Sequence, residues 1–268
     1  MNLATQLSVN GNGIDDPAAL LKRISALAGR DPLLKLDRLC AGYRSTRILH
    51  GIDLQLGAGQ SVCLIGPNGA GKSTVLNAIY GFAAIYSGSV FVGGRDATRI
   101  SQSAKLKELG MAYLLQGNSV FPDMTVEENL RLGGYLKGRG VLAREAAESI
   151  FDRYPRLAER RKQPARMLSG GERRLLEISR ALVMNPRILL VDEPSIGLEP
   201  RHTHMIFEVL QELQHNRGMS IVMVEQNARQ GLKFADIGYM VVAGQVVLAA
   251  PADELLRHHT MQPLFLQK

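Results

Sequence analysis

The sequence of 268 residues contains no tryptophan, only two cysteines and few aromatic residues. Cys40 and Cys63 lie in apolar segments without metal-ligand spacing, which disfavours a cysteine metal site and weakly indicates a reducing, cytoplasmic setting. No apolar run approaches the roughly 20 residues that a membrane-spanning helix needs. The first residues lack a basic start followed by an apolar stretch, so we expect no secretion signal.

The charge is positive overall, with a net value of +7 and an isoelectric point near 9.6. Such a balance suits nucleic acid, an anionic membrane surface or phosphate ligands. The densest basic run, residues 159–166, carries no aromatic side chain on which a base could stack. We therefore interpret that run as solvated surface and expect no nucleic-acid partner.

Residues 1–32 form an expected N-terminal extension with one short amphipathic helix. Asp16 and Pro17 are suited to the start of a helix, and Gly29 is suited to its end. Leu20, Leu21, Ile24 and Leu27 recur between them at helical spacing. This helix could pack on its own domain, on a partner or on a membrane surface, and the first is favoured.

From residue 34 onward, short apolar strands alternate with helical patterns, which is typical of an α/β fold with parallel strands. Residues 125–161 carry long helical patterns that interrupt this alternation, and Thr125 with Glu128 forms an expected capping box. Near the end, residues 239–250 are expected to form a hairpin. Strands are predicted at 34–39, 48–56, 61–66, 89–97, 111–116, 188–194 and 220–226, and a helix at 202–217 closed by Gly218.

The segment GPNGAGKST follows one apolar strand and precedes a helical pattern, as a phosphate-binding loop does. Glycines let the backbone N–H groups face phosphate oxygens, and the helix start adds a positive end. Lys72 is expected to reach the β- and γ-phosphates, and the Ser73 hydroxyl to bind Mg²⁺. The nucleotide-binding residues predicted here are Gly66, Pro67, Asn68, Gly69, Ala70, Gly71, Lys72, Ser73 and Thr74.

The segment ILLVDE ends a second apolar strand on two carboxylates. At the carboxyl end of a parallel strand, Asp192 is expected to hold the Mg²⁺ shell through water. Glu193 is expected to orient or deprotonate the attacking water. Together with the phosphate loop, these residues predict a nucleoside-triphosphate hydrolase.

The segment LSGGE, residues 168–172, starts a helix about 20 residues before ILLVDE and resembles the signature motif of ATP-binding-cassette proteins. Ser169, Gly170 and Gly171 would form a further anion site. The resemblance covers about residues 33–250. It implies a domain over 33–268 with a P-loop NTPase (RecA-like) core, an antiparallel β subdomain and an inserted α-helical subdomain at about 117–165.

Other cassette elements resemble segments of this sequence one by one. Tyr43 matches the aromatic residue that stacks on adenine, although it could also be a core tyrosine. Gln116 matches the Q-loop glutamine, which contacts Mg²⁺ and the attacking water. The segment SIGLEP resembles the D-loop at the dimer interface, with Glu199 in place of the usual aspartate.

Gln226 ends the strand IVMVEQ where cassettes usually carry a histidine that contacts the γ-phosphate. A glutamine amide can donate a hydrogen bond to a phosphate oxygen but cannot become a cation. Gln226 therefore either supports hydrolysis as an adequate substitute or marks the weaker of two unequal sites.

The Glu-Gln-Asn at residues 225–227 and the segment VFPDMTVEENLRLGGY resemble the ATPase subunits of branched-chain amino-acid uptake transporters. Relatives of that kind import urea, amides or aromatic acids. The resemblance implies ATP and Mg²⁺ as ligands, and a second cassette ATPase subunit, identical or not, in a head-to-tail dimer. It also implies integral-membrane permease subunits, a solute-binding protein and a peripheral location on the cytoplasmic face of the inner membrane.

Two other functions remain open from the sequence. One is a soluble cassette ATPase that acts on nucleic acid or ribosomes, but such proteins commonly carry two cassettes or a coiled-coil insertion, and neither is visible. The other is a regulatory cassette that binds ATP without turnover. Glu193 disfavours this second reading, whereas Gln226 and Glu199 are compatible with it.

Overall fold

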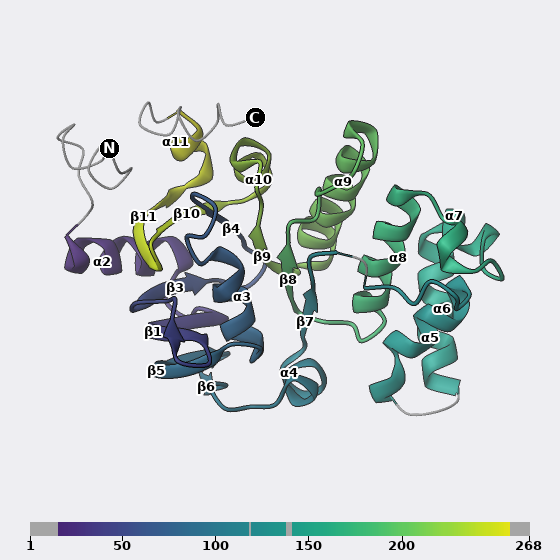
Figure 1. Cartoon of the computed structure of the whole chain (residues 1–268), viewed down its shortest axis with the longest axis horizontal. Coiled ribbons are helices and arrows are strands. Elements are labelled where there is room, and N and C mark those ends of the chain that lie inside the picture. Colours follow the sequence, from purple (N-terminus) through teal and green to yellow (C-terminus); the bar gives the residue numbers. More distant parts are fainter. Residues whose placement is uncertain (1–15, 118, 138–140, 258–268) are drawn as a thin grey trace. The chain divides into compact units, whose positions relative to one another are not determined.

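The computed structural model describes residues 16–117, 119–137 and 141–257, which divide into two compact units (Figure 1). Unit 1 comprises the described residues within 1–100 and 220–268, and unit 2 those within 101–219. The elements of unit 1 are α2 (Pro17–Ala28), β1 (Leu34–Tyr43), β2 (Thr46–Arg47), β3 (Ile52–Leu56), β4 (Ser61–Ile65), α3 (Lys72–Tyr80), β5 (Ala84–Val92), β6 (Arg95–Asp96), β9 (Ser220–Val224), α10 (Ala228–Phe234), β10 (Ile237–Val242), β11 (Gln245–Pro251) and α11 (Ala252–Arg257).

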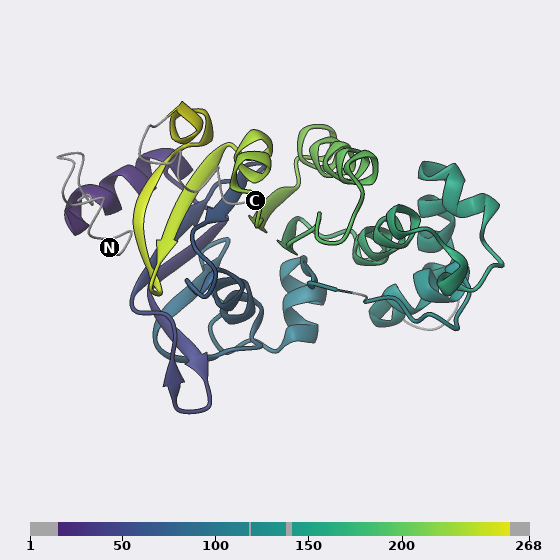
Figure 2. The same cartoon turned by 45° about the horizontal axis from the view of Figure 1, so that its top comes forward.

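The first sheet of unit 1 is antiparallel, as the sequence predicted for a β subdomain. The long strand β1 pairs with β2, β3 and β5, and β5 pairs with β6. Figure 2 shows the hairpin of β1 and β2 projecting from the sheet. The strand predicted at 48–56 is shorter in the structure, because only Ile52–Leu56 pairs as β3.

The second group of strands in unit 1 is mostly parallel and carries the predicted phosphate loop. Strand β4 lies between β9 and β10 and is parallel to both, and β10 continues into the antiparallel hairpin with β11. All five residues of β4 and of β9 are buried. Helices α10 and α11 cover this group through an apolar cluster that includes Cys63, Leu232 and Leu255.

Helix α2 packs on its own unit. It begins at Pro17 after Asp16, whose side chain makes no capping hydrogen bond, and it contacts β3 and β11 (Figure 1). Leu20 and Ile24 are buried against the sheets, whereas the neighbouring Leu21 is exposed. The Ser25 hydroxyl accepts a hydrogen bond from the Gln55 amide at 3.2 Å, which fixes the helix on β3.

Unit 2 holds two parallel strands with helices around them. In chain order its elements are α4 (Gln102–Leu109), β7 (Met111–Leu114), α5 (Val126–Gly133), the 3₁₀ helix η1 (Tyr135–Lys137), α6 (Val141–Arg153), α7 (Pro155–Glu159), the 3₁₀ helix η2 (Ala165–Met167), α8 (Gly170–Leu182), β8 (Ile188–Asp192) and α9 (Pro200–Arg217). Figure 2 shows α5 to α7 gathered beside α8. The predicted capping box is confirmed, with Thr125 and Glu128 bonded reciprocally at the start of α5.

The predicted helical subdomain at 117–165 falls within unit 2, and its boundaries remain a prediction. In the parts of the chain that the structure describes, we find no helix of the length and apolarity needed to cross a membrane.

Candidate functional site

The phosphate loop connects β4 to α3 in unit 1. Gly66, Gly69 and Gly71 all have positive φ angles, which are unfavourable for residues with a Cβ atom. Gly66 has a second requirement, since a Cβ there would lie 2.0 Å from the carbonyl oxygen of Val241. Helix α3 begins at Lys72, so its unbonded N–H groups open onto the loop.

Lys72 is folded into this loop rather than extended into solvent. Its ammonium donates hydrogen bonds to the carbonyl oxygens of Gly66 and Pro67 at 2.9 and 3.0 Å, and the residue is 7% exposed. The loop therefore holds the cation against two of its own carbonyl oxygens, at the start of α3. A bound anion would find both charge and donors there.

Tyr43 lies at the end of β1 and is 39% exposed. Its hydroxyl accepts a hydrogen bond of 2.7 Å from the side-chain amide of Asn77 on α3. The ring is therefore fixed beside the helix that starts in the phosphate loop. Its exposure disfavours the alternative that Tyr43 is a core tyrosine and is compatible with stacking on a ligand.

Gln226 emerges at the same sheet edge as the phosphate loop. In the parallel pair of β4 and β9, Leu64 is opposite Val224, so Gly66 and Gln226 each follow two residues later. Gln226 is exposed, whereas the preceding Glu225 is 2% exposed and accepts a hydrogen bond from the Asn227 amide. The two polar residues after this strand thus differ. The Glu225 carboxylate accepts a backbone hydrogen bond from the following turn, whereas the Gln226 side chain is exposed to solvent.

A second set of predicted residues meets in unit 2. Strands β7 and β8 are parallel with Leu114 opposite Val191, so Gln116 and Glu193 also leave their strands side by side. The Gln116 amide nitrogen donates a hydrogen bond to the Glu193 carboxylate at 2.6 Å. Asp192 is 4% exposed and accepts a hydrogen bond from the Tyr113 hydroxyl at 3.3 Å.

Glu193 has a φ angle of 46°, in the left-handed region that residues with a Cβ atom rarely adopt. Such backbone strain persists only where the surroundings hold it, and it clusters at functional positions. The structure supplies a support that the sequence analysis missed. The guanidinium of Arg174 on α8 donates to the carbonyl oxygen of Glu193 at 2.8 Å and to that of Pro194 at 3.1 Å.

Arg174 also connects this strand end to the segment after β7. It is 5% exposed, forms a buried ion pair of 2.6 Å with Glu177, and donates to the carbonyl oxygen of Leu115. The Glu177 carboxylate in turn accepts the backbone N–H of Ser119 at 2.9 Å. One ion pair on α8 therefore holds the backbones on both sides of Gln116 and Glu193.

Ser169 is the N-cap residue of α8. Its hydroxyl oxygen accepts the Glu172 amide, and the Glu172 carboxylate accepts the Ser169 amide, in a second capping box. Burial alone would raise the pKa of Glu172, but hydrogen bonds from Ser169 and Arg160 outweigh it and keep that pKa below its usual range. Ser169 and Gly170 are exposed at the helix start, where the helix dipole favours an anion.

The predicted site residues thus form two groups. Unit 1 gathers Tyr43, the loop 66–74 and Gln226, and unit 2 gathers Gln116, Ser169–Gly171, Asp192 and Glu193. Their individual roles remain predictions. Each group combines backbone donors with polar side chains at the carboxyl ends of parallel strands, which is where α/β folds bind ligands.

Comparison with known proteins identifies the family. The model of the ABC transporter family matches residues 49–196. LivF of Archaeoglobus fulgidus, a probable branched-chain amino acid transport ATP-binding protein, is 36% identical over 87% of this chain and 98% of its own length. BraG of Pseudomonas aeruginosa, a high-affinity branched-chain amino acid transport ATP-binding protein, is 36% identical over 87% and 99%. LptB of Escherichia coli, a lipopolysaccharide export system ATP-binding protein, is 30% identical over 87% and 96%.

A solved structure of an ATP-binding cassette has a similar fold. MJ1267, an ATP-binding cassette of an ABC transporter, has a TM-score of 0.78 at 27% identity, over 89% of this chain and 98% of that one. Fold and loop define a P-loop nucleoside triphosphatase. The chain belongs to the ABC transporter family and is an ATP-binding cassette of the ATP-hydrolysing kind.

Proposed function

We propose that this chain is the ATP-hydrolysing subunit of an importer for branched-chain amino acids or a related small polar solute, such as urea, an amide or an aromatic acid. The observation that carries the proposal is the 36% identity to LivF and BraG across nearly their whole length. The export protein LptB is similar over the same span at 30%. The Glu-Gln-Asn at residues 225–227 adds support for the importer reading.

The partners in this proposal are integral-membrane permease subunits, a second cassette ATPase and a solute-binding protein, with the chain on the cytoplasmic face of the inner membrane. Unit 2 offers a surface suited to such a partner. Between residues 115 and 135, five large apolar side chains are exposed, and exposed apolar surface is typical of interaction sites. They are Leu115, Phe121, Met124, Leu132 and Tyr135.

In the proposed mechanism, ATP lies in the loop 66–74 with Lys72 at the β- and γ-phosphates and Tyr43 stacked on adenine. The donor set fits Mg²⁺, a hard cation that prefers oxygen ligands and accepts few from protein when phosphates supply the rest. Ser73, Asp192 and the carbonyl oxygen of Gln116 would hold it. When bound, Mg²⁺ would neutralise charge on the phosphates.

Glu193 is the proposed base that orients the attacking water, and Gln116 positions it. The Gln116 amide nitrogen already donates to the Glu193 carboxylate, so its carbonyl oxygen remains directed to other ligands. Ser169, Gly170 and Gly171 would contact the γ-phosphate of ATP bound to the partner subunit. Closure of the dimer would exclude bulk water from the reaction.

Gln226 is the proposed donor to the γ-phosphate. Replacement with alanine is expected to lower ATP turnover by about tenfold to a hundredfold, the usual effect of losing a hydrogen bond to a charged group. Gln226→His should stay within about threefold of the parent, because an imidazole N–H can donate in the same direction. Turnover by both variants would be measured with phosphate release, and unfolding with urea would show that an exposed position leaves the fold intact. A large gain for Gln226→His would instead mark the parent as the weaker site of an unequal pair.

The proposed function is tested by solute uptake. Deletion of the gene in the source organism is expected to reduce uptake of radiolabelled leucine or of one related solute, and expression of the parent chain should restore it. Lys72→Ala serves as the matched control, since it removes the proposed phosphate contact and should restore nothing. Unchanged uptake of leucine, urea, amides and aromatic acids, together with loss of lipopolysaccharide from the cell surface, would contradict the proposal.

A further inference from the structure

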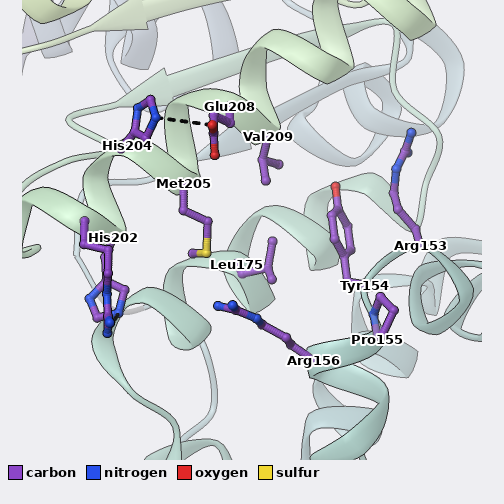
Figure 3. A pocket seen from close by; sticks show the side chains of 11 residues that line it. Arg153, Tyr154, Pro155, Arg156, Leu175, His202, His204, Met205, Glu208 and Val209 are labelled. Carbon is purple, nitrogen blue, oxygen red and sulfur yellow. Dashed lines mark hydrogen bonds and ion pairs between the residues drawn. The ribbon is translucent and has the colours of Figure 1, made fainter.

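A pocket of about 590 Å³ lies within unit 2, at a place that the proposed ATP mechanism does not use (Figure 3). Its walls come from the end of α6, from Tyr154 and α7, from α8 and from the first three turns of α9. That volume is in the range of small-molecule sites and far exceeds what a single inorganic ion would fill.

The lining combines apolar and cationic side chains. Leu175, Met205 and Val209 form an apolar part, and Figure 3 shows Arg156 reaching toward Met205 and Leu175 from the opposite wall. Three arginines line the pocket, Arg153, Arg156 and Arg201, and so do two histidines, His202 and His204. Glu208 is the single carboxylate of the lining.

The acids nearby neutralise only part of this charge. Glu208 pairs with His204 at 3.2 Å, and Arg153 pairs with Glu212 at 2.8 Å. Arg156 and Arg201 form no ion pair within the part of the chain that the structure describes. The contact of Arg201 is instead the ring nitrogen of His202, at 3.4 Å.

Two polar side-chain atoms of the residues that line the pocket lack a hydrogen-bond partner in the described part of the chain. They are the Tyr154 hydroxyl and Nη1 of Arg153, and both are buried. Tyr154 is 8% exposed, and burial raises the pKa of its hydroxyl to about 12, so the group is a neutral donor. Buried polar groups in proteins are nearly always satisfied, and because these two atoms are closed to solvent, each side chain must turn toward the pocket before a ligand oxygen can bond it.

The pocket also adjoins the start of the signature helix. His202 lies against Gly171 so closely that a Cβ on Gly171 would be 2.5 Å from the His202 ring. Leu175 belongs to the same helix, and Arg160, just beyond α7, pairs with Glu172 at 2.8 Å. A ligand that moved either wall would therefore act on the position of Ser169 and its glycines.

We propose that this pocket binds a small aliphatic carboxylate, whose charged end meets the arginines and whose body covers Leu175, Met205 and Val209, and that the bound ligand changes ATP turnover through α8. Guanidinium groups bind carboxylates through paired hydrogen bonds. The regulatory half rests on the proposed ATPase role of the signature residues, whereas the binding half stands without it.

Binding is tested with the full chain in the absence of nucleotide, by saturation-transfer NMR titration with hexanoate. We expect a dissociation constant on the order of 1 mM. Hexan-1-ol, which has the body without the charge, and acetate, which has the charge without the body, should each bind at least about tenfold more weakly. Tighter binding of inorganic phosphate than of hexanoate would overturn the carboxylate assignment, and equal binding of the alcohol would overturn the role of the arginines.

Variants locate the site. Arg156→Gln, at an exposed position, should weaken hexanoate binding by about tenfold, and Tyr154→Phe should weaken it while preserving the ring. Arg144→Gln on the exposed face of α6 is the matched control and should change nothing. The absence of hexanoate binding, or equal binding by Arg156→Gln and the parent, would overturn the proposal.

The regulatory half is tested by ATP turnover with saturating hexanoate. Turnover of the parent should change by at least about twofold, and Arg156→Gln should show no such response. Binding without any change in turnover would overturn this half alone. An inactive parent would contradict the proposed ATPase function, which is distinguishable because the NMR titration needs no hydrolysis.

Discussion

Glu193→Gln is expected to lower ATP turnover by about 10²- to 10⁴-fold, the range that a positioned general base contributes. The amide has the same shape as the carboxylate, and its oxygen can still accept the hydrogen bond from Gln116. ATP binding by Lys72 and its loop, and the fold around Asp192, should therefore persist. Because the closed dimer reopens only after hydrolysis, ATP should keep the variant as a dimer.

The measurements are phosphate release and size-exclusion chromatography with and without ATP. Glu145→Gln makes the same chemical change at an exposed position of α6 and should leave both measurements unchanged. Adding Lys72→Ala to Glu193→Gln should abolish the ATP-dependent dimer, which would show that it forms through bound nucleotide. Turnover near the parent level, or no shift of Glu193→Gln on the column with ATP, would mean that another group activates the water.

The sequence predicted that Gln116 and Glu193 each lie at the end of an apolar strand, but not that these two strands are neighbours, which the structure shows. Parallel strands end at one edge, and the registers of β7 with β8 and of β4 with β9 place the following residues together. The glycines within residues 66–71 likewise predicted a curled phosphate-binding loop, and the structure has positive φ angles at Gly66, Gly69 and Gly71. Local rules sufficed for the phosphate loop, since its strand, loop and helix are consecutive in the chain.

Arg174 and Glu177 could not be predicted in this way. On sequence they are an arginine and a glutamate three residues apart in an amphipathic helix, a spacing typical of an exposed surface pair. Their burial depends on β7 and β8, which lie far away in the chain and supply the carbonyl and N–H groups that satisfy them. Glu225 was missed for the same reason, because a strand end looks exposed until the turn after it is known.

Arg174→Met is expected to lower the free energy of unfolding by about 3–5 kcal/mol, because it leaves the Glu177 carboxylate buried without its cation. Glu177 is 4% exposed, so water cannot replace the lost partner. The double variant Arg174→Met with Glu177→Met removes both charges and should recover most of that loss, as replacements of whole buried ion pairs often do. Urea unfolding of the parent, both single variants and the double variant would give the coupling energy.

Catalysis separates the positioning role of Arg174 from its role in stability. In the double variant the carbonyl oxygens of Glu193 and Pro194 lose their donor, and the strained backbone of Glu193 can relax. We expect kcat to fall about tenfold or more with little change in the KM for ATP, because the bound nucleotide is held by unit 1 residues whereas the base is displaced. Arg174→Lys restores a cation but not the branched donor set, so it should recover stability more than kcat. A double variant that matches the parent in kcat would show that the strand end keeps its geometry without Arg174, and a single variant that loses less than about 1 kcal/mol would show that the ion pair is not closed to solvent.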